Sequence, residues 1–214
     1  LTPMLSPCAA EQNQYKWSIS PEKVSTMDLS SYFKGYKGSF VLYDLKVDSW
    51  NIYDMEQATL RTSPHSTYKI YAALFGLEEG IISPDDSFMS WNGTDYPFET
   101  WNMDQDLSSA MLSSVNWYFQ EIDEQLGLPV IQNYIRKIGY GNESISSNLS
   151  SYWMQSTLNI SPIEQVELLT DIYHNRFGFT PENVNIVKDS ICLYYSGNKN
   201  LYGKTGTGRV DGQD

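Results

Sequence analysis

Short runs of aromatic and branched apolar residues lie near both ends of the chain, and polar turns separate them. Residues 39–44 and 51–53 bracket one such turn and predict a pair of strands. Near the C-terminus, residues 191–195 and 201–207 flank a Gly-Asn turn and predict a hairpin. The two ends are therefore expected to supply the strands of a sheet.

The middle of the chain carries apolar residues at helical spacing instead. Residues 70–77 follow Pro64 and predict one helix. Residues 113–126 predict a second helix that ends at Gly127, and a third helix is expected to begin at Pro129 and end at Gly139. These segments predict a mainly helical central region.

One more helix has a clear start. Ser161 and Glu164 form the pattern of a capping box, with Pro162 at the first helical position. The helix that follows is predicted to be amphipathic, with an apolar face formed by Val166, Leu169, Ile172 and Tyr173.

The order of these elements is strands, a helical block, a helix and strands. This order predicts an α/β (α+β) fold, in which an antiparallel sheet is flanked by helices and lies beside a helical lobe. We expect one domain over residues 1–214, with sheet parts at about 1–64 and 162–214 and a helical lobe at about 66–160. The sequence contains no internal repeats.

The charge balance excludes some functions. The chain has 26 acidic and 14 basic residues and a formal net charge of -12, so binding to nucleic acid is not expected. Cys8 and Cys192 do not have the spacing of a metal site, and His65 and His174 are the only histidines. A zinc enzyme and a Ser-His-Asp triad are therefore both poorly supported.

Nucleophile chemistry is suggested by a Ser three residues before a Lys. This spacing occurs four times, and Ser66-Thr67-Tyr68-Lys69 is favoured because Ser63-Pro64 precedes it at a helix start. Residues three apart share a helix face, so the Ser66 hydroxyl and the Lys69 amine can meet. The other three Ser-x-x-Lys segments have simpler interpretations. Ser20–Lys23 looks like a helix cap, Ser31–Lys34 leads directly into Gly35, and Ser196–Lys199 is expected to form a hairpin turn.

Lys204-Thr205-Gly206-Thr207, near the end of the chain, predicts the wall that holds a substrate carboxylate in serine acyl-transfer enzymes. A cationic pocket formed by Lys69, Lys204 and Arg209 would suit an anionic small molecule in this acidic chain.

Five motifs follow one another along the chain. They are Pro64-His65-Ser66-Thr67-Tyr68-Lys69, Ser114-x-Asn116, Tyr140-Gly141-Asn142, Trp153 and Lys204-Thr205-Gly206. As an ordered set they resemble the class D (oxacillinase-type) serine β-lactamases and, more closely, the extracellular sensor domain of the BlaR/MecR-type β-lactam signal transducers of Gram-positive bacteria. The resemblance spans roughly residues 38–207 and implies the serine β-lactamase/penicillin-binding fold.

The resemblance implies a role for each motif residue in acylation by a β-lactam. Ser66 attacks the lactam carbonyl, Lys69 takes its proton, and Ser114 relays a proton to the leaving nitrogen with Lys204 nearby. The backbone N–H groups of Ser66 and Thr207 form the oxyanion hole. The expected ligand-binding residues are Thr205, Gly206, Thr207, Trp153 and Tyr140, with Trp153 packed on Lys69.

One departure separates the sensor domains from the hydrolases. Class D enzymes usually carry an aliphatic residue where this chain has Asn116. In this family the motif Lys can be N-carboxylated by CO2, which requires a neutral amine in an apolar pocket, and no other cofactor is expected. A polar Asn116 beside Lys69 competes for hydrogen bonds, so the carbamate that activates the deacylating water is expected to be lost.

A long-lived acyl-protein that signals induction of resistance is thus the expected function. The alternatives are a class D β-lactamase that hydrolyses penicillins, a D,D-peptidase-type penicillin-binding protein, and a scaffold with an inert pocket. The resemblance further implies membrane helices upstream of Leu1, a location on the outer face of the cell membrane, and the rest of the transducer as partner. It also implies that the natural domain continues with further strands beyond Asp214.

Overall fold

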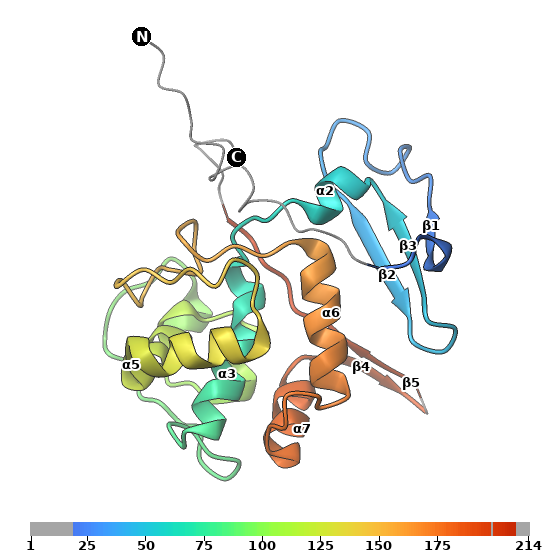
Figure 1. The fold of residues 1–214 in the computed structure, drawn as a ribbon. Coiled ribbons are helices and arrows are strands. Elements are labelled where there is room, and N and C mark those ends of the chain that lie inside the picture. Colours follow the sequence, from blue (N-terminus) through green and yellow to red (C-terminus); the bar gives the residue numbers. More distant parts are fainter. Residues whose placement is uncertain (1–18, 198, 209–214) are drawn as a thin grey trace.

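The computed structural model describes residues 19–197 and 199–208 (Figure 1). A short 3-10 helix, η1 (Pro21–Lys23), leads into a three-stranded sheet with the order β1 (Val24–Thr26), β3 (Ser49–Tyr53), β2 (Phe40–Asp44). The predicted pair β2 and β3 is antiparallel, with Phe40 opposite Tyr53 and Asp44 opposite Ser49. The short strand β1 pairs with β3 in parallel, which differs from the expectation of a wholly antiparallel sheet.

The second sheet is the predicted C-terminal hairpin. Strands β4 (Cys192–Ser196) and β5 (Lys199–Tyr202) are antiparallel, and the described strands of this hairpin form no ladder with β1–β3. The strand expected over residues 201–207 ends at Tyr202, because its partner strand β4 begins at Cys192. One more backbone hydrogen bond continues the pairing, from Gly203 N–H to Ile191 O at 2.9 Å. The Lys204-Thr205-Gly206 motif therefore lies in an extended segment after the hairpin.

The helical lobe is built around α3 (Lys69–Glu78), which continues directly from the 3-10 helix η2 (His65–Tyr68). Every residue of α3 from Lys69 to Leu77 is buried, as expected of a helix that other elements surround. Helices α5 (Asn116–Ile138) and α7 (Pro181–Ser190) both pack against α3. The remaining lobe elements, η3 (Glu99–Trp101) and α4 (Leu107–Leu112), are short, and the short helix α2 (Met55–Thr59) packs against β3 beside the three-stranded sheet.

Two predicted helix ends are confirmed, but the helix expected to begin at Ser113 begins at Asn116, after the left-handed backbone of Ser114. Helix α5 contains one residue with non-helical backbone angles, Gly127, so it is a pair of helices joined at the predicted break. Gly139 ends the second of them. Helix α6 (Pro162–Tyr173) begins with the predicted capping box between Ser161 and Glu164.

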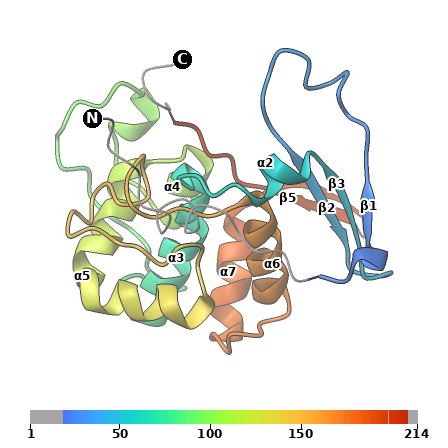
Figure 2. The ribbon, with the colours of Figure 1, turned by 45° about the horizontal axis from the view of Figure 1, so that its top comes forward.

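The buried face of α6 is rotated from the predicted one. Ile163, Leu168 and Ile172 are buried, whereas Leu169 is 40% exposed and Tyr173 is 59% exposed. The reason is that α6 packs on two sides. Both views show α6 between α3 of the lobe and strands β2 and β3 (Figures 1 and 2).

The two sides of α6 correspond to two apolar cores. The large core fills the helical lobe, and the small one consists of Trp50, Ile52, Ala58 and Ile163. No helix in the described part of the chain is long and apolar enough to cross a membrane.

Candidate active site

The candidate nucleophile Ser66 lies in the turn of η2 that leads into α3. The Thr67 hydroxyl donates to Pro64 O at 2.7 Å and holds the start of this turn. Because η2 runs without interruption into α3, Ser66 and Lys69 project from the same side, and their Oγ and Nζ atoms are 3.0 Å apart. The structure thus brings together the first predicted pair.

The Lys69 amine lies in a fully buried pocket and is surrounded by oxygen atoms. Its Nζ lies 3.0 Å from Ser114 Oγ, 2.5 Å from Ser114 O and 2.6 Å from Asn116 Oδ1, in addition to Ser66 Oγ. Three aromatic rings enclose the same atom, with centroids at 5.5 Å for Trp153, 5.6 Å for Phe119 and 5.9 Å for Trp101.

This environment changes the protonation of Lys69. Burial, and to a smaller extent the nearby Lys204 cation, lower the pKa of Lys69 to about 6. The neutral amine therefore predominates at pH 7 and can accept a proton from the Ser66 hydroxyl at 3.0 Å.

Ser114 joins the two halves of the site. It lies between α4 and α5 with a left-handed backbone conformation (φ 53°), which directs both its carbonyl and its hydroxyl to Lys69. Its Oγ also lies 2.9 Å from Nζ of Lys204, whose second contact is Thr205 O at 2.9 Å. Burial lowers the pKa of Lys204. A proton can therefore pass between Ser66, Lys69, Ser114 and Lys204 through contacts of hydrogen-bond length.

The Lys204-Thr205-Gly206 segment packs directly on the start of η2. A Cβ atom at Gly206 would lie 2.9 Å from Pro64 O and 3.4 Å from Ser66 N. Only glycine permits this approach, which explains the residue type at this position of the motif. The consequence is that the carboxylate wall and the nucleophile face the same space.

That space is a pocket of about 350 Å³. Five of the predicted site residues line it, together with Phe98, Thr100, Trp101 and Ser113, which the sequence analysis missed. The predicted residues in the lining are Ser66, Ser114, Asn116, Thr205 and Thr207. The missed residues come from the irregular segment around η3 and from the end of α4, and their one sequence signal is a high density of aromatic residues between positions 88 and 101.

Two predicted ligand-binding residues lie elsewhere. Trp153 is fully buried beside Lys69, as expected for packing, but it is not part of the pocket lining. Tyr140 is fully buried behind α3, where its ring contacts Tyr68 and Tyr71 edge-on and its hydroxyl lies 3.4 Å from Nε2 of Gln165. At these positions both side chains make structural contacts, and their expected contacts with a ligand stay predictions.

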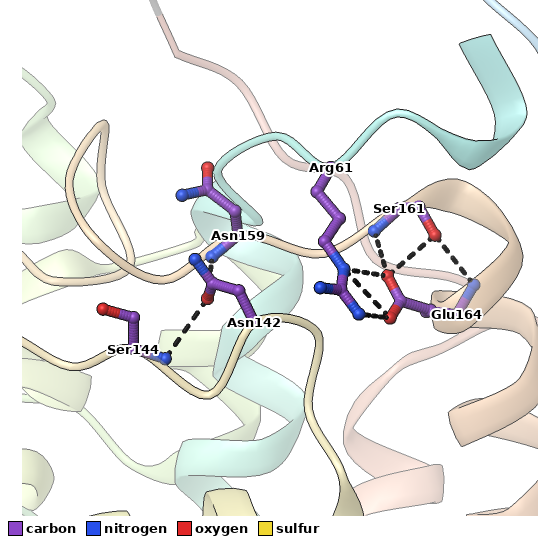
Figure 3. A network of polar contacts seen from close by, with 6 residues as sticks. All are labelled: Arg61, Asn142, Ser144, Asn159, Ser161 and Glu164. Atoms are coloured by element: carbon purple, nitrogen blue, oxygen red, sulfur yellow. Dashed lines mark hydrogen bonds and ion pairs between the residues drawn. The ribbon is translucent and has the colours of Figure 1, made fainter. Parts of the chain in front are cut away.

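The Tyr140-Gly141-Asn142 motif serves as a clamp for the segment before α6 (Figure 3). Asn142 Oδ1 accepts from the N–H groups of Asn159 at 3.0 Å and Ser144 at 3.2 Å, and its Nδ2 donates to Thr157 O at 2.8 Å. Gly141 has a φ of 53°, and a Cβ atom there would collide with the carbonyl of Asn159. The glycine and the amide side chain of this motif therefore both hold the segment before α6 in place.

A buried ion pair adjoins this clamp. Arg61 approaches both carboxylate oxygens of Glu164, with its Nε at 3.1 and 3.0 Å (Figure 3). Glu164 also accepts from the N–H and the hydroxyl of Ser161, at 2.9 and 2.8 Å. The capping box of α6 is thus fixed to the segment that leads to Ser66.

Within residues 19–197 and 199–208, no group of three or more His, Cys, Asp or Glu side chains is arranged to hold a metal ion. Cys192 is a free cysteine, and His65 donates its backbone N–H to Trp153 O at 3.0 Å. Cys8 and Arg209, which the sequence analysis considered, lie outside the described residues.

The comparisons with known proteins agree with this geometry. Residues 34–214 match the penicillin binding protein transpeptidase domain family. The chain is 45% identical over 188 residues to regulatory protein BlaR1 of Bacillus licheniformis, covering 87% of this chain and 31% of that protein. The chain thus spans about a third of the length of that curated relative.

Solved structures give the same result. The C-terminal domain of the Bacillus licheniformis BlaR penicillin-receptor superposes with a TM-score of 0.85 at 45% identity, covering 88% of this chain and 77% of that one. The class D β-lactamase BAT-2 has a TM-score of 0.81 at 34% identity, covering 89% and 79%. The chain therefore belongs to the penicillin-binding protein transpeptidase domain family, in which it is similar to the BlaR penicillin-receptor domain and to the class D β-lactamases.

Proposed function

We propose that this chain is the β-lactam-binding part of a sensor, in which Ser66 is acylated and the acyl group is retained. The observation that carries this proposal is the surroundings of the Lys69 amine. The Lys69 pKa of about 6 suits the proton transfer that acylation requires. The same amine donates a hydrogen bond to Asn116 Oδ1 at 2.6 Å.

Acylation follows from the contacts of the site. The Ser66 oxygen forms a bond to the lactam carbonyl carbon while its proton passes to the neutral Lys69 amine. The carbon–nitrogen bond of the lactam then breaks, and the ring nitrogen receives a proton from the Ser114 hydroxyl. Ser114 in turn regains a proton from Lys69 or Lys204. Lys204, Thr205 and Thr207 bind the ligand carboxylate, and the N–H groups of Ser66 and Thr207 bind the developing oxyanion.

Retention of the acyl group depends on the absence of a base that activates water. In the class D manner that base would be a carbamate on Lys69, formed when the neutral amine adds CO2 and releases one proton. Asn116 opposes the carbamate because its Oδ1 is an acceptor, which attracts the amine N–H but repels a carboxylate. We propose that the ester is therefore hydrolysed slowly.

The whole protein is proposed to be a membrane-bound transducer with this domain on the outer face of the cell. This part rests on the similarity to regulatory protein BlaR1, of which the chain matches 31%. The proposed ligand is a β-lactam antibiotic, the proposed partner is the rest of the transducer, and nucleic acid is excluded as a ligand by the net charge of -12.

Intact-protein mass spectrometry with benzylpenicillin tests the proposal. The parent protein should gain one penicillin mass that persists for hours, and Ser66→Ala should gain none. Ser113→Ala is the matched control, because this serine lines the same pocket and should leave the adduct unchanged. Labelling of Ser66→Ala, or labelling lost equally in both variants, would contradict the assignment of the nucleophile.

The class D β-lactamase alternative has specific support in the TM-score of 0.81 with BAT-2 at 34% identity. Nitrocefin hydrolysis separates the two functions. A sensor releases about one equivalent of product per molecule, whereas a hydrolase continues through many turnovers until the substrate is consumed.

A further inference from the structure

A glutamine of α6 reaches the turn that carries the nucleophile. The Nε2 of Gln165 donates to the hydroxyl of Thr67 at 2.9 Å, and its Oε1 accepts from the hydroxyl of Tyr71 at 3.3 Å. Tyr71 is a fully buried residue of α3, so both ends of the amide are held by the helical lobe. Gln165 is not among the residues that line the Ser66 pocket, and the acylation steps do not use it.

The hydroxyl of Thr67 lies between this amide and the backbone of the nucleophile turn. It donates to Pro64 O at 2.7 Å, and the N–H of Thr67 donates to the same oxygen at 3.2 Å. A hydroxyl has a single hydrogen, so a donor on its other side directs that hydrogen to its acceptor. Gln165 supplies this donor, and it therefore fixes the direction of the bond from Thr67 to Pro64 O.

Pro64 O is also the point at which the Lys204-Thr205-Gly206 segment packs on the turn. A Cβ atom at Gly206 would lie 2.9 Å from Pro64 O, 3.2 Å from Cγ2 of Thr67 and 3.4 Å from Ser66 N. A shift of Pro64 or Thr67 would thus move Ser66 relative to this segment. Acylation requires a precisely placed nucleophile and oxyanion donors, so such a shift would slow the reaction although every reacting group is still present.

The backbone of Gln165 is held in place as well. The preceding residue, Glu164, completes the capping box of α6 and forms the ion pair with Arg61. The first turn of α6 is therefore anchored, and the side chain of Gln165 transmits this anchoring to the turn at Ser66.

We infer that Gln165 is a positioning residue for acylation, which holds Ser66 in its reactive place through the hydroxyl of Thr67. The inference rests on the proposed function, because it concerns the same nucleophile. Gln165 makes no contact with the ligand in this scheme. The maximal rate of acylation should therefore depend on Gln165, whereas the affinity of the non-covalent complex should not.

Stopped-flow acylation by nitrocefin at varied concentrations separates these two quantities. Gln165→Met removes the donor and should lower the maximal acylation rate roughly tenfold, with the dissociation constant of the non-covalent complex unchanged. Thr67→Val should give the same loss, and Thr67→Ser, which keeps the hydroxyl, should retain the parent rate. The double variant Gln165→Met/Thr67→Val should be no slower than either single variant, because the two residues act through one contact.

Thr170→Val is the matched control on α6. The hydroxyl of Thr170 donates within the helix, to Val166 O at 2.8 Å, so its loss should leave both constants at the parent values. A parent rate in Gln165→Met, or losses that multiply in the double variant, would overturn the inference.

The backbone amide signal of Ser66 in NMR spectra of 15N-labelled protein is a second readout, which does not depend on acylation. It should move in the same direction in Gln165→Met and Thr67→Val and keep its position in Thr170→Val. An unchanged signal in Gln165→Met would contradict the inference. If the parent protein gains no penicillin, the proposed function is rejected, and the amide signal still decides whether Gln165 positions Ser66.

A second substitution covers the case in which Gln165→Met does not fold. Gln165→Glu keeps the length of the side chain and an acceptor for Tyr71, but its carboxylate offers no N–H to Thr67. The expected loss of acylation rate and the contradicting results are the same as for Gln165→Met.

Discussion

At the scale of single residues, the chemistry depends on how Lys69 is held. Its amine has four oxygen neighbours within 3.0 Å and three aromatic rings around it, yet among the described residues it contacts no carboxylate. Acceptors without negative charge orient the amine but do little to retain its proton, so burial determines the outcome.

A pH profile of acylation should report this protonation. Below its pKa of about 6 Lys69 is charged and cannot take the Ser66 proton, so the second-order rate of penicillin labelling should rise with pH and level off above about 7. Stopped-flow measurements between pH 5 and 8 give the profile. His65 adjoins Ser66, and burial lowers its pKa, so His65→Asn is the control. A rate independent of pH in both proteins would remove Lys69 as the base.

Asn116 is the residue that should separate sensing from hydrolysis. Asn116→Val removes the acceptor at 2.6 Å from Lys69 and leaves an apolar wall, which favours the carbamate and should shorten the lifetime of the penicillin adduct roughly tenfold. The adduct lifetime is followed by intact-protein mass spectrometry with bicarbonate present. Thr100→Val, which changes a polar residue of the same pocket without touching Lys69, should have no such effect. An unchanged lifetime in Asn116→Val would show that water access, not the base, limits deacylation.

Helical spacing predicted that Ser66 and Lys69 would be neighbours, whereas Ser114, Asn116 and the Lys204 segment were expected beside them through the resemblance to the family. The aromatic pocket wall at Phe98 and Trp101 was missed because it comes from an irregular segment, which has no periodicity to recognise.

At the scale of elements, local signals predicted helix ends better than helix faces. The capping box at Ser161 and the break at Gly127 involve neighbouring residues, and both are confirmed. The buried face of α6 depends on partners at two sides, so the expected stripe with Leu169 and Tyr173 is replaced by one with Leu168. The strand expected to reach Thr207 depends in the same way on a neighbour, and it stops at Tyr202.

The contact between Gly141 and the segment before α6 can be tested by adding one methyl group. Gly141→Ala combines a left-handed backbone with a collision against Asn159 O, so the free energy of unfolding should fall by about 2–5 kcal/mol. Gly80→Ala is the matched control, because Gly80 also has a left-handed backbone (φ 71°) but no atom lies near its added Cβ. This variant should lose only about 1–2 kcal/mol of unfolding free energy. Urea denaturation measures both, and equal losses would mean that the close approach has no energetic weight.

At the scale of the whole molecule, the ion pair between Arg61 and Glu164 links the two apolar cores. Glu164 belongs to α6, which lies between the helical lobe and the three-stranded sheet, and Arg61 belongs to the segment that leads into the lobe (Figure 3). Both side chains are mostly buried, at 17% exposure for Arg61 and 7% for Glu164, so the ion pair is largely shielded from solvent.

Breaking this pair should destabilise the molecule strongly. Glu164→Ala breaks this mostly buried ion pair and removes the side chain that completes the capping box of α6, so the free energy of unfolding should fall by about 3–5 kcal/mol. Asp171→Ala removes the partner of Arg176, which is 62% exposed, and should cost at most about 1 kcal/mol. Denaturant titration compares the two variants, and similar values for both would argue against a buried link.

The approach of Gly206 to Pro64 O and Ser66 N joins two parts of the chain that are far apart in the sequence. Chain entropy makes such distant segments meet late, after the local helices have formed. We therefore expect reactivity toward penicillin only in molecules in which the segment around Gly206 has packed against Pro64 and Ser66. The yield of penicillin labelling therefore measures the fraction of native molecules in a partly folded sample. During refolding, the signal from penicillin labelling should appear later than the helical signal in far-UV circular dichroism.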